Sequence, residues 1–137
     1  MKINDQIADG GSVKGAPLIL LRAEGLLIFI LSIFLYGYIG ASWWRFAALL
    51  LVPDIVMAGY WLGPRWGAVF YNAGHSYIGP LLLAGLPVLG SHAGWWPYLL
   101  IWVAHIAMDR ALGYGLKYAA GFKQTHLGLS RVYERAG

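Results

Sequence analysis

Four apolar stretches, each about as long as a membrane-crossing helix, constrain this chain more than any other feature. About 20 apolar residues in a helix cross the hydrocarbon core of a bilayer, and helices joined by short turns pack as antiparallel neighbours. Charged residues make up only 12% of the 137-residue sequence, roughly half of their share in soluble domains. The sequence therefore predicts an all-α integral membrane protein, a four-helix bundle of up-down-up-down topology. The four predicted helices cover residues 17–38, 44–62, 66–89 and 96–116.

The sequence outside these stretches is polar. One domain, residues 17–118, carries the helices between a polar N-terminal tail, residues 1–16, and a polar C-terminal tail, residues 119–137. The first tail lacks a short apolar core followed by a cleavage site, so no removable signal peptide is expected. Pro80 lies inside the third stretch and is expected to kink it.

Lysine and arginine are distributed unequally between the two ends of the predicted bundle. An even number of spans places both termini on one side of the membrane. Arg45 falls on the opposite side, and the positive-inside rule then places both termini in the cytoplasm. The basic residues on the side of the termini are Lys2, Lys14, Arg65, Lys117, Lys123, Arg131 and Arg135.

Composition also excludes several classes of protein. The chain has no cysteine, which rules out disulfides, cysteine-ligated zinc and iron–sulfur clusters. Its net charge of +4 comes from dispersed basic residues, so no nucleic-acid partner is expected.

Polar side chains interrupt the apolar stretches at one common depth. His105 and Asp109 are four residues apart, so they share one face of the fourth predicted helix. At 1.5 Å per residue, Glu24, Asp54 and His75 lie with them in a slab roughly 12–18 Å from the cytoplasmic ends. Ionisable groups at such depth are expensive and indicate a functional site.

The leading interpretation of this level is a metal site. Asp54, His75, His105 and Asp109 are the predicted ligands, because imidazole and carboxylate groups bind Zn, Mn or Fe. Inward side chains on facing helices build such sites in helical bundles.

Six further residues are expected to support a reaction at that site. Glu24 would be the general base or a fifth ligand, and Arg22 or Arg110 would stabilise a developing oxyanion. Tyr71 and Asn72 would hydrogen-bond to ligands and orient them. His126 is expected in a surface turn, with a lid over the cytoplasmic mouth as the alternative.

Three other interpretations use the same residues. The first is an ion-pair network that joins helices, although three carboxylates against Arg22 and Arg110 leave a charge of −1. The second is a small transporter in which these groups carry protons or ions, and four short spans would then require a homo-oligomer. The third is a haem bound by His75 and His105, which gives the carboxylates no role.

Six short motifs resemble those of a family of small bacterial four-helix membrane proteins, catalogued as a domain of unknown function. The resemblance covers about residues 17–129 and implies a four-span fold in the bacterial inner membrane, without an assigned activity. Histidine and aspartate ligands on several membrane helices are also similar to the intramembrane zinc hydrolases of the alkaline ceramidase and adiponectin-receptor superfamily, which have seven spans and more histidines. The motifs are Leu21-Arg22-Ala23-Glu24-Gly25, Pro53-Asp54, Tyr71-Asn72-Ala73-Gly74-His75, His105-Ile106-Ala107-Met108-Asp109-Arg110, Gly113-Tyr114-Gly115-Leu116-Lys117-Tyr118 and Thr125-His126-Leu127-Gly128.

We therefore expect a metal-dependent intramembrane enzyme, a hydrolase or an isomerase or cyclase, that acts on an apolar or lipid-like substrate among membrane lipids. The alternatives are a proton- or ion-coupled transporter and a non-catalytic membrane scaffold. The polar level lies nearer the cytoplasmic ends of the helices, so the pocket is expected to open there and to be closed toward the outside. The residues expected around its mouth are Arg65, Lys117, Lys123 and His126.

Overall fold

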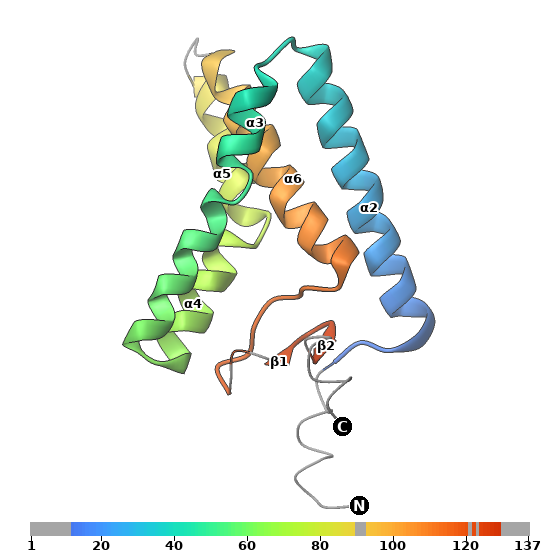
Figure 1. The fold of residues 1–137 in the computed structure, drawn as a ribbon, viewed down its shortest axis with the longest axis vertical. Helices are drawn as coiled ribbons and strands as arrows, with labels where there is room; N and C mark the ends of the chain where they lie inside the picture. The colour runs from blue at the N-terminus through green and yellow to red at the C-terminus, as the bar shows by residue number, and fades with distance from the viewer. Residues whose placement is uncertain (1–11, 90–92, 121, 123, 130–137) are drawn as a thin grey trace, which may run out of the picture.

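The computed structural model describes residues 12–89, 93–120, 122 and 124–129, and this part of the chain is mostly helical. The chain ascends through its first helix, descends, ascends again and descends through its last helix, as the view of Figure 1 shows. A short antiparallel hairpin follows the last helix. The elements are α2 (Gly15–Tyr38), α3 (Trp43–Leu49), η1 (Val52–Leu62), α4 (Pro64–Gly74), α5 (Ile78–Leu89), η2 (Ala93–Trp95), α6 (Trp96–Leu112), β1 (Gln124–Thr125) and β2 (Gly128–Leu129).

The first and last apolar stretches each form one helix, α2 and α6. The last helix ends earlier than expected because Gly113 adopts a left-handed conformation, with φ of 92°. Its backbone N–H caps the helix by donating to the carbonyl of Arg110. Glycine adopts this conformation without steric penalty and is a common helix terminator.

The second apolar stretch is not one uniform α-helix. It starts as α3 and continues as η1, a 3₁₀ helix of 11 residues. Pro53 lies in the first turn of η1, where proline is tolerated because it has no N–H to donate. The tighter 3₁₀ helix begins at Val52, directly before this proline, and Asp54 lies in the same turn.

The third stretch is broken at a different residue from the one predicted. The expected kink at Pro80 is wrong, because α4 stops at Gly74 and α5 restarts at Ile78. Pro80 is the third residue of α5. In this first turn a backbone N–H has no partner inside the helix, so the missing N–H of proline costs no hydrogen bond. The break therefore precedes the proline and leaves His75 at the end of a helix.

Two helix pairs make up most of the packing. Gly25 lets α2 approach α6 closely, since a Cβ there would lie 2.7 Å from Cβ of Arg110. Gly67 has the same role between α4 and η1, where the ring of Tyr60 covers it. The buried core lies near the turn between α2 and α3 and contains Tyr36, Phe46, Ile101 and Ala104.

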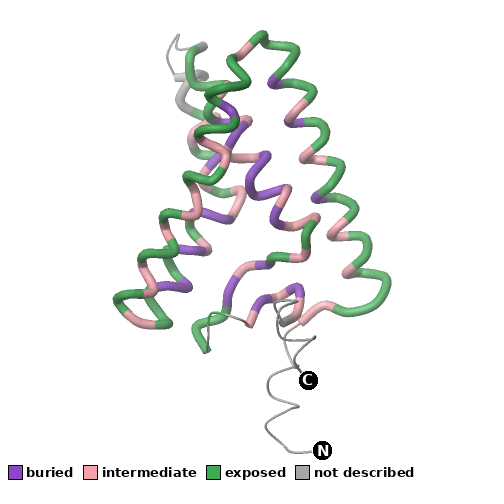
Figure 2. The backbone as a smooth tube through the Cα atoms, in the orientation of Figure 1, coloured by how far each residue is buried: buried purple, intermediate pink, exposed green. Residues whose placement is uncertain are grey.

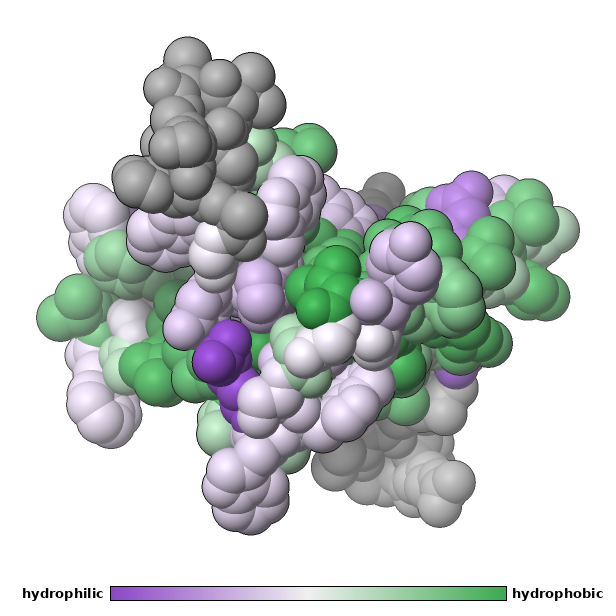
Figure 3. Space-filling model, turned by 90° about the horizontal axis from the view of Figure 1, so that it is seen from above, coloured by the Kyte–Doolittle hydropathy of each residue, from purple (hydrophilic) through white to green (hydrophobic). Residues whose placement is uncertain are grey.

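Apolar side chains cover much of the outward surface. Within the described part of the chain, two helical segments are long and apolar enough to cross a membrane, Gly15–Tyr38 and Trp43–Leu62. Only 11% of the apolar stretch of the first and 6% of that of the second is buried, which is unlike the core helix of a soluble domain. Buried residues concentrate on α6 and on the sides of α2 and α4 that face inward (Figure 2). Seen from above, hydrophobic residues also reach the outer surface of the helices (Figure 3).

The chain after α6 folds back across the end of the molecule where α2 begins (Figure 1). Lys117 forms an isolated antiparallel bridge with Thr125. Val13 donates its N–H to the carbonyl of His126 at 2.8 Å. Part of the predicted C-terminal tail is therefore ordered against the helices, and residues 130–137 lie outside the described part of the chain.

Candidate metal centre

The four residues predicted as ligands come from three elements that meet beneath the core. Asp54 lies in the first turn of η1, and His75 is the C-cap residue of α4. His105 and Asp109 are one turn apart on α6. Each offers one ligand atom, and these atoms lie within 4.8 Å of one another. The structure thus brings together a buried group that could hold a metal ion.

Nε2 of His75 contacts the other three ligand groups. It lies 3.2 Å from Oδ1 of Asp54 and 3.4 Å from Oδ2 of Asp109. It also lies 3.0 Å from Nε2 of His105. That second nitrogen lies 3.5 Å from the Asp54 oxygen and 3.7 Å from the Asp109 oxygen.

These five separations are close to the edges of a tetrahedral metal site. With bonds of about 2.0–2.2 Å to histidine nitrogen and carboxylate oxygen, a tetrahedron has edges of about 3.3–3.6 Å. Five of the six edges run from 3.0 to 3.7 Å, and the sixth, between Asp54 and Asp109, is within 4.8 Å. Two imidazoles and two carboxylates suit Zn, Mn or Fe. The donor set and its spacing therefore both fit a divalent metal.

The His75 ring is fixed from behind. Its Nδ1 donates to the carbonyl of Tyr71 at 2.9 Å, and the Tyr71 ring stacks on it with centroids 3.8 Å apart. When Nδ1 of a neutral histidine carries the proton, Nε2 presents a lone pair. His75 thus faces the centre with an acceptor atom, as a metal ligand must.

His105 also faces the centre, but unlike His75 it has no hydrogen bond from a described residue at Nδ1 that holds its ring. It is 0% exposed, and its Nδ1 has no hydrogen-bond partner within the described residues. No neighbour there fixes which nitrogen carries the proton. Nε2 of His105 is therefore able to present its lone pair to a metal.

The distance between the two histidines does not suit a haem. Two nitrogens that bind one iron from opposite faces are about 4 Å apart, twice a bond of about 2.0 Å. The 3.0 Å between Nε2 of His75 and Nε2 of His105 is shorter. Two carboxylate oxygens also occupy the place that a macrocycle would need.

Side chains of α6 hold the end of α4 in place. Nε1 of Trp102 donates to the carbonyl of Gly74 at 2.7 Å, and Arg110 donates to the carbonyl of His75 at 2.8 Å. The last carbonyls of a helix lack partners inside the helix. These two bonds satisfy them and fix the position of His75 relative to His105.

The three residues predicted as catalytic groups do not enter the cluster. Arg110 binds the backbone of His75 and of Tyr114. Arg22 donates from Nε to the carbonyl of Ala111 at 3.0 Å and so caps the end of α6. Glu24 is exposed on α2, outside the group of ligands.

Glu24 lies at the predicted depth but does not reach the cluster. Depth along a helix sets only the height of a residue, whereas its facing depends on a rotation of about 100° per residue. Gly25 is buried against α6, and this directs its neighbour Glu24 away from the interior. The expected fifth ligand or base is therefore not supplied by α2.

Of the two residues expected to orient ligands, only Tyr71 contacts one. Its hydroxyl donates to Oδ2 of Asp109 over 3.4 Å. Asn72 instead pairs with the backbone of Lys117, donating to its carbonyl at 2.8 Å and accepting from its N–H at 2.7 Å. Asn72 thus joins α4 to the segment that follows α6.

A polar cavity of about 200 Å³ lies on one side of the cluster. Asp54, with its side chain 40% exposed, is the most accessible of the four ligands. Lys117 was predicted only at the mouth of the site, and Tyr114 and Phe122 were not predicted to line it. The left-handed Gly113 ends α6 and turns the chain under the cluster. A glycine at the end of the last apolar stretch was the sequence feature that could have predicted this turn. The cavity is lined by Asp54, Met57, Tyr71, Asp109, Tyr114, Lys117 and Phe122.

Lys117 is buried in the wall of this cavity. Its Nζ donates to the carbonyl of Phe122 at 2.8 Å and lies 3.7 Å from the centroid of the Phe122 ring. It is also 4.6 Å from the centroid of the Tyr71 ring. Burial lowers the pKa of Lys117, against the opposing effect of Asp109 and Asp54.

His126 lies in the turn of the hairpin, as the preferred interpretation expected. Its Nδ1 accepts from the N–H of Leu116 at 2.8 Å, and its N–H donates to the carbonyl of the same residue at 3.1 Å. The ring also covers Gly115 closely. His126 therefore anchors the returning segment and is absent from the residues that line the polar cavity.

A second, apolar cavity of about 430 Å³ lies next to the cluster. Pro53 and Gly74 line it, and each directly precedes a ligand, Asp54 and His75. The two cavities therefore adjoin the same short stretches of η1 and α4. The lining residues are Leu49, Val52, Pro53, Val56, Gly74, Tyr98, Ile101 and Trp102.

Comparison with known proteins gives one family. The family described as Domain of unknown function (DUF4260) matches residues 18–129, which include all four candidate ligands. No curated protein and no solved structure matches the chain.

Proposed function

The chain belongs to the DUF4260 family, and we propose that it is a membrane-embedded metalloenzyme that acts on an apolar or lipid-like substrate. The observation that carries this proposal is the convergence of Asp54, His75, His105 and Asp109 within 4.8 Å. Helices that are merely joined by ion pairs would match carboxylates with lysine or arginine. Here the carboxylates face two histidines instead.

A divalent metal at this centre would polarise a substrate oxygen or activate a bound water. The two sides of the centre differ in how accessible their ligands are. His75 and His105 are 0% exposed, whereas Asp54 borders the polar cavity. A substrate would therefore approach beside Asp54, while the histidines hold the metal from the closed side.

The apolar cavity supports a substrate with a hydrophobic part. Its volume, about 430 Å³, lies within the range of small-molecule sites, which are mostly apolar with a few polar groups. Trp102 lines it and also binds the backbone next to His75. An apolar chain held there would place its polar end at the ligands.

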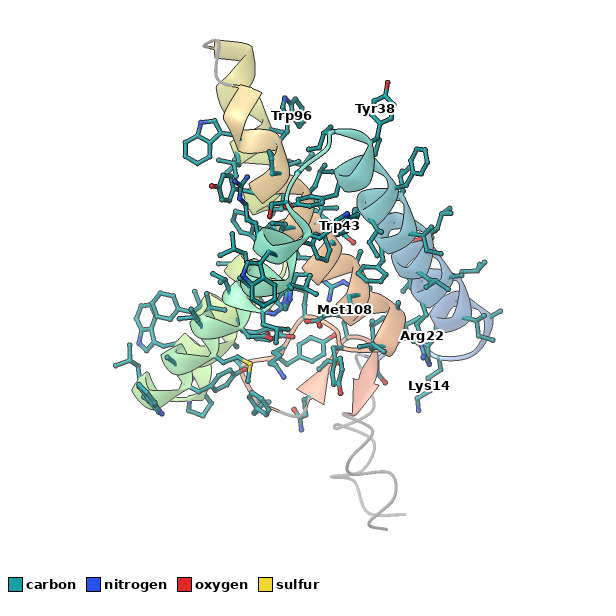
Figure 4. All side chains as sticks on the ribbon, turned by 45° about the horizontal axis from the view of Figure 1, so that its top comes forward. Lys14, Arg22, Tyr38, Trp43, Trp96 and Met108 are labelled. Atoms are coloured by element: carbon teal, nitrogen blue, oxygen red, sulfur yellow. The ribbon has the colours of Figure 1, made fainter. Side chains whose placement is uncertain are left out.

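The environment of the site is proposed to be a bacterial inner membrane crossed four times. Figure 4 supports this orientation: Tyr38 and Trp96 lie at one end of the helices, whereas Lys14 and Arg22 lie at the other. Aromatic residues favour membrane interfaces and cationic residues favour the cytoplasmic side. The polar cavity would open toward the cytoplasm, because Lys117 and the hairpin lie at the basic end.

Metal analysis of the purified protein tests the proposal. The wild type is expected to hold about one metal ion per chain, and His105→Ala is expected to lose it. His126→Ala is the matched control, because His126 is a histidine outside the ligand group and the variant should keep the metal. A wild type that holds no metal, or a His105→Ala variant that holds as much as the wild type, would overturn the proposal.

Transport is the competing function for the same groups, and a second measurement separates the two. Tyr98 is the one titratable residue among the described residues that line the apolar cavity, so this cavity offers protons no series of titratable groups to pass along. We therefore expect no proton flux into proteoliposomes. Flux that Asp54→Asn abolishes would favour the transporter.

A further inference from the structure

Two cations lie near the candidate metal centre without forming an ion pair with it. Arg110 directs its guanidinium to the carbonyls of His75 and Tyr114. Lys117 directs its ammonium to the carbonyl of Phe122. Within the described residues, neither lies within 4.0 Å of a carboxylate of the cluster. Their charges are therefore available to another anion.

The charge around the centre depends on the metal. Asp54 and Asp109 contribute −2, and Lys117 and Arg110 contribute +2, so the empty site is neutral. A divalent metal adds +2 to a largely buried place. An uncompensated buried charge is expensive, and a bound anion would neutralise it. The metal-loaded centre is thus suited to an anionic ligand.

The polar cavity places such an anion against both positive groups. Lys117, Asp54 and Asp109 line the same cavity of about 200 Å³. A small group inside it can contact a metal held by the two carboxylates and the lysine ammonium at once. Arg110 is not among the residues that line the cavity, so Lys117 is the cation that an entering molecule meets.

The ammonium of Lys117 is also held in position. The backbone of the residue is fixed by two hydrogen bonds to Asn72, and the rings of Tyr71 and Phe122 flank the ammonium. A lysine ammonium has three N–H donors, and one goes to Phe122. A donor held in place by its surroundings binds with less loss of conformational entropy than a free surface lysine.

We propose that the polar cavity binds an oxyanion, a carboxylate or a phosphate, with one oxygen on the metal and another accepting a hydrogen bond from Lys117. This inference rests on the metal site of the proposed function and specifies its substrate as an amphiphile with an acidic head. The acidic head occupies the cavity beside Lys117. The apolar part extends toward Pro53 and Gly74.

The test is a titration of the cobalt(II)-loaded protein, whose visible absorption reports on the ligands of the metal. Cobalt content is measured first, then orthophosphate and acetate are added in separate experiments, followed by a long-chain alkyl phosphate. The variants are Lys117→Met, Lys117→Arg and Arg65→Met. Arg65 is an exposed cation outside the polar cavity and serves as the control.

We expect at least one of the two small anions to shift the cobalt spectrum of the wild type. Lys117→Met should bind that anion about tenfold more weakly or worse, in keeping with about 1.5–3 kcal/mol for a hydrogen bond to a charged group. Lys117→Arg should recover most of the affinity, and Arg65→Met should match the wild type. The alkyl phosphate should bind more tightly than orthophosphate.

Two different failures are distinguishable. A wild type that takes up no cobalt or other divalent metal contradicts the metal site, and the oxyanion site falls with it. A wild type that holds one cobalt whose spectrum responds to neither anion contradicts the oxyanion site alone, as does a Lys117→Met variant with full metal and unchanged anion affinity. Because methionine keeps the length of the side chain, circular dichroism and metal content check that this variant folds.

Discussion

The Nε2 atoms of His75 and His105 lie 3.0 Å apart, with their rings inclined by 66°. His75 presents a lone pair at this contact because its Nδ1 donates to Tyr71. When Nε2 of His105 presents a lone pair as well, two lone pairs and two carboxylate oxygens at such distances repel one another unless a cation lies between them. This contact links the local hydrogen bonds of α4 to the chemistry of the site.

Divalent metal is therefore expected to stabilise the folded protein. At a free concentration about 100 times its dissociation constant, the metal raises the free energy of unfolding by about 2.7 kcal/mol. Thermal unfolding in detergent, with and without a chelator, measures the effect. His75→Ala should show no shift on chelation, and a wild type equally stable with and without metal would contradict the prediction.

Removing the Tyr71 hydroxyl tests the support behind the ligands. Tyr71→Phe keeps the ring that stacks on His75 and loses the bond to Asp109. Partners that orient ligands contribute about 10–100-fold to metal affinity, and we expect a loss near the lower limit because the bond is 3.4 Å long. Competition with a chromogenic chelator measures the affinity.

Tyr77→Phe is the matched control for that variant. The Tyr77 hydroxyl is buried and has no hydrogen-bond partner among the described residues, and Tyr77 is not in the ligand group. Its removal should leave the metal affinity unchanged. Equal losses in the two variants would show that any tyrosine replacement loosens the fold.

Some of the site could be predicted from the sequence because the physical constraints there are strong. His105 and Asp109 are four residues apart on one helix, and Asp54 and His75 interrupt apolar stretches where polar groups are expensive. The direction in which Glu24 points could not be predicted, because the rotation of α2 about its axis is set by the close contact of Gly25 with α6. Lys117 lies beyond the last helix, in a segment whose path depends on bonds to Asn72 and Leu116.

The fold shows the same division. Length and hydropathy predicted α2 and α6 well, because a continuous apolar stretch suffices for one helix. The break at His75 was not predicted, since the end of α4 is held by tertiary bonds from Trp102 and Arg110 to the carbonyls of Gly74 and His75. The change to a 3₁₀ helix at Val52, next to Pro53, was not predicted either. The break at His75 is also what lets its ring point toward α6 at the end of a helix.

Gly25→Ala is expected to separate α2 from α6. A methyl group there would lie 2.7 Å from Cβ of Arg110 and 2.8 Å from the backbone nitrogen of Ala111, so a helix must move. Overpacking of this kind costs about 1–3 kcal/mol. Gly85→Ala is the control, because nothing lies within 4 Å of the added carbon and alanine favours helix by about 0.5–1 kcal/mol. Unfolding temperatures in detergent compare the two, and equal stability would contradict the close packing.

Acid is expected to loosen the segment anchored by His126. Burial, together with the nearby charge of Arg110, lowers the pKa of His126 below its ordinary value of 6.5. The folded segment therefore holds the neutral ring, which accepts the N–H of Leu116, and this bond is fully present above pH 6.5. Below that pH the unfolded state binds the proton more readily, so stability falls as pH decreases.

Hydrogen exchange of the Leu116 amide measures this loss directly. In the wild type, the protection of the amide should decrease as pH falls below 6.5, after correction for the intrinsic exchange rate. In His126→Leu it should be low at every pH, because the acceptor is missing. Effects of pH elsewhere in the molecule are shared by both proteins, so the difference between them isolates His126. Protection in the wild type that is independent of pH would contradict the role given to its neutral ring.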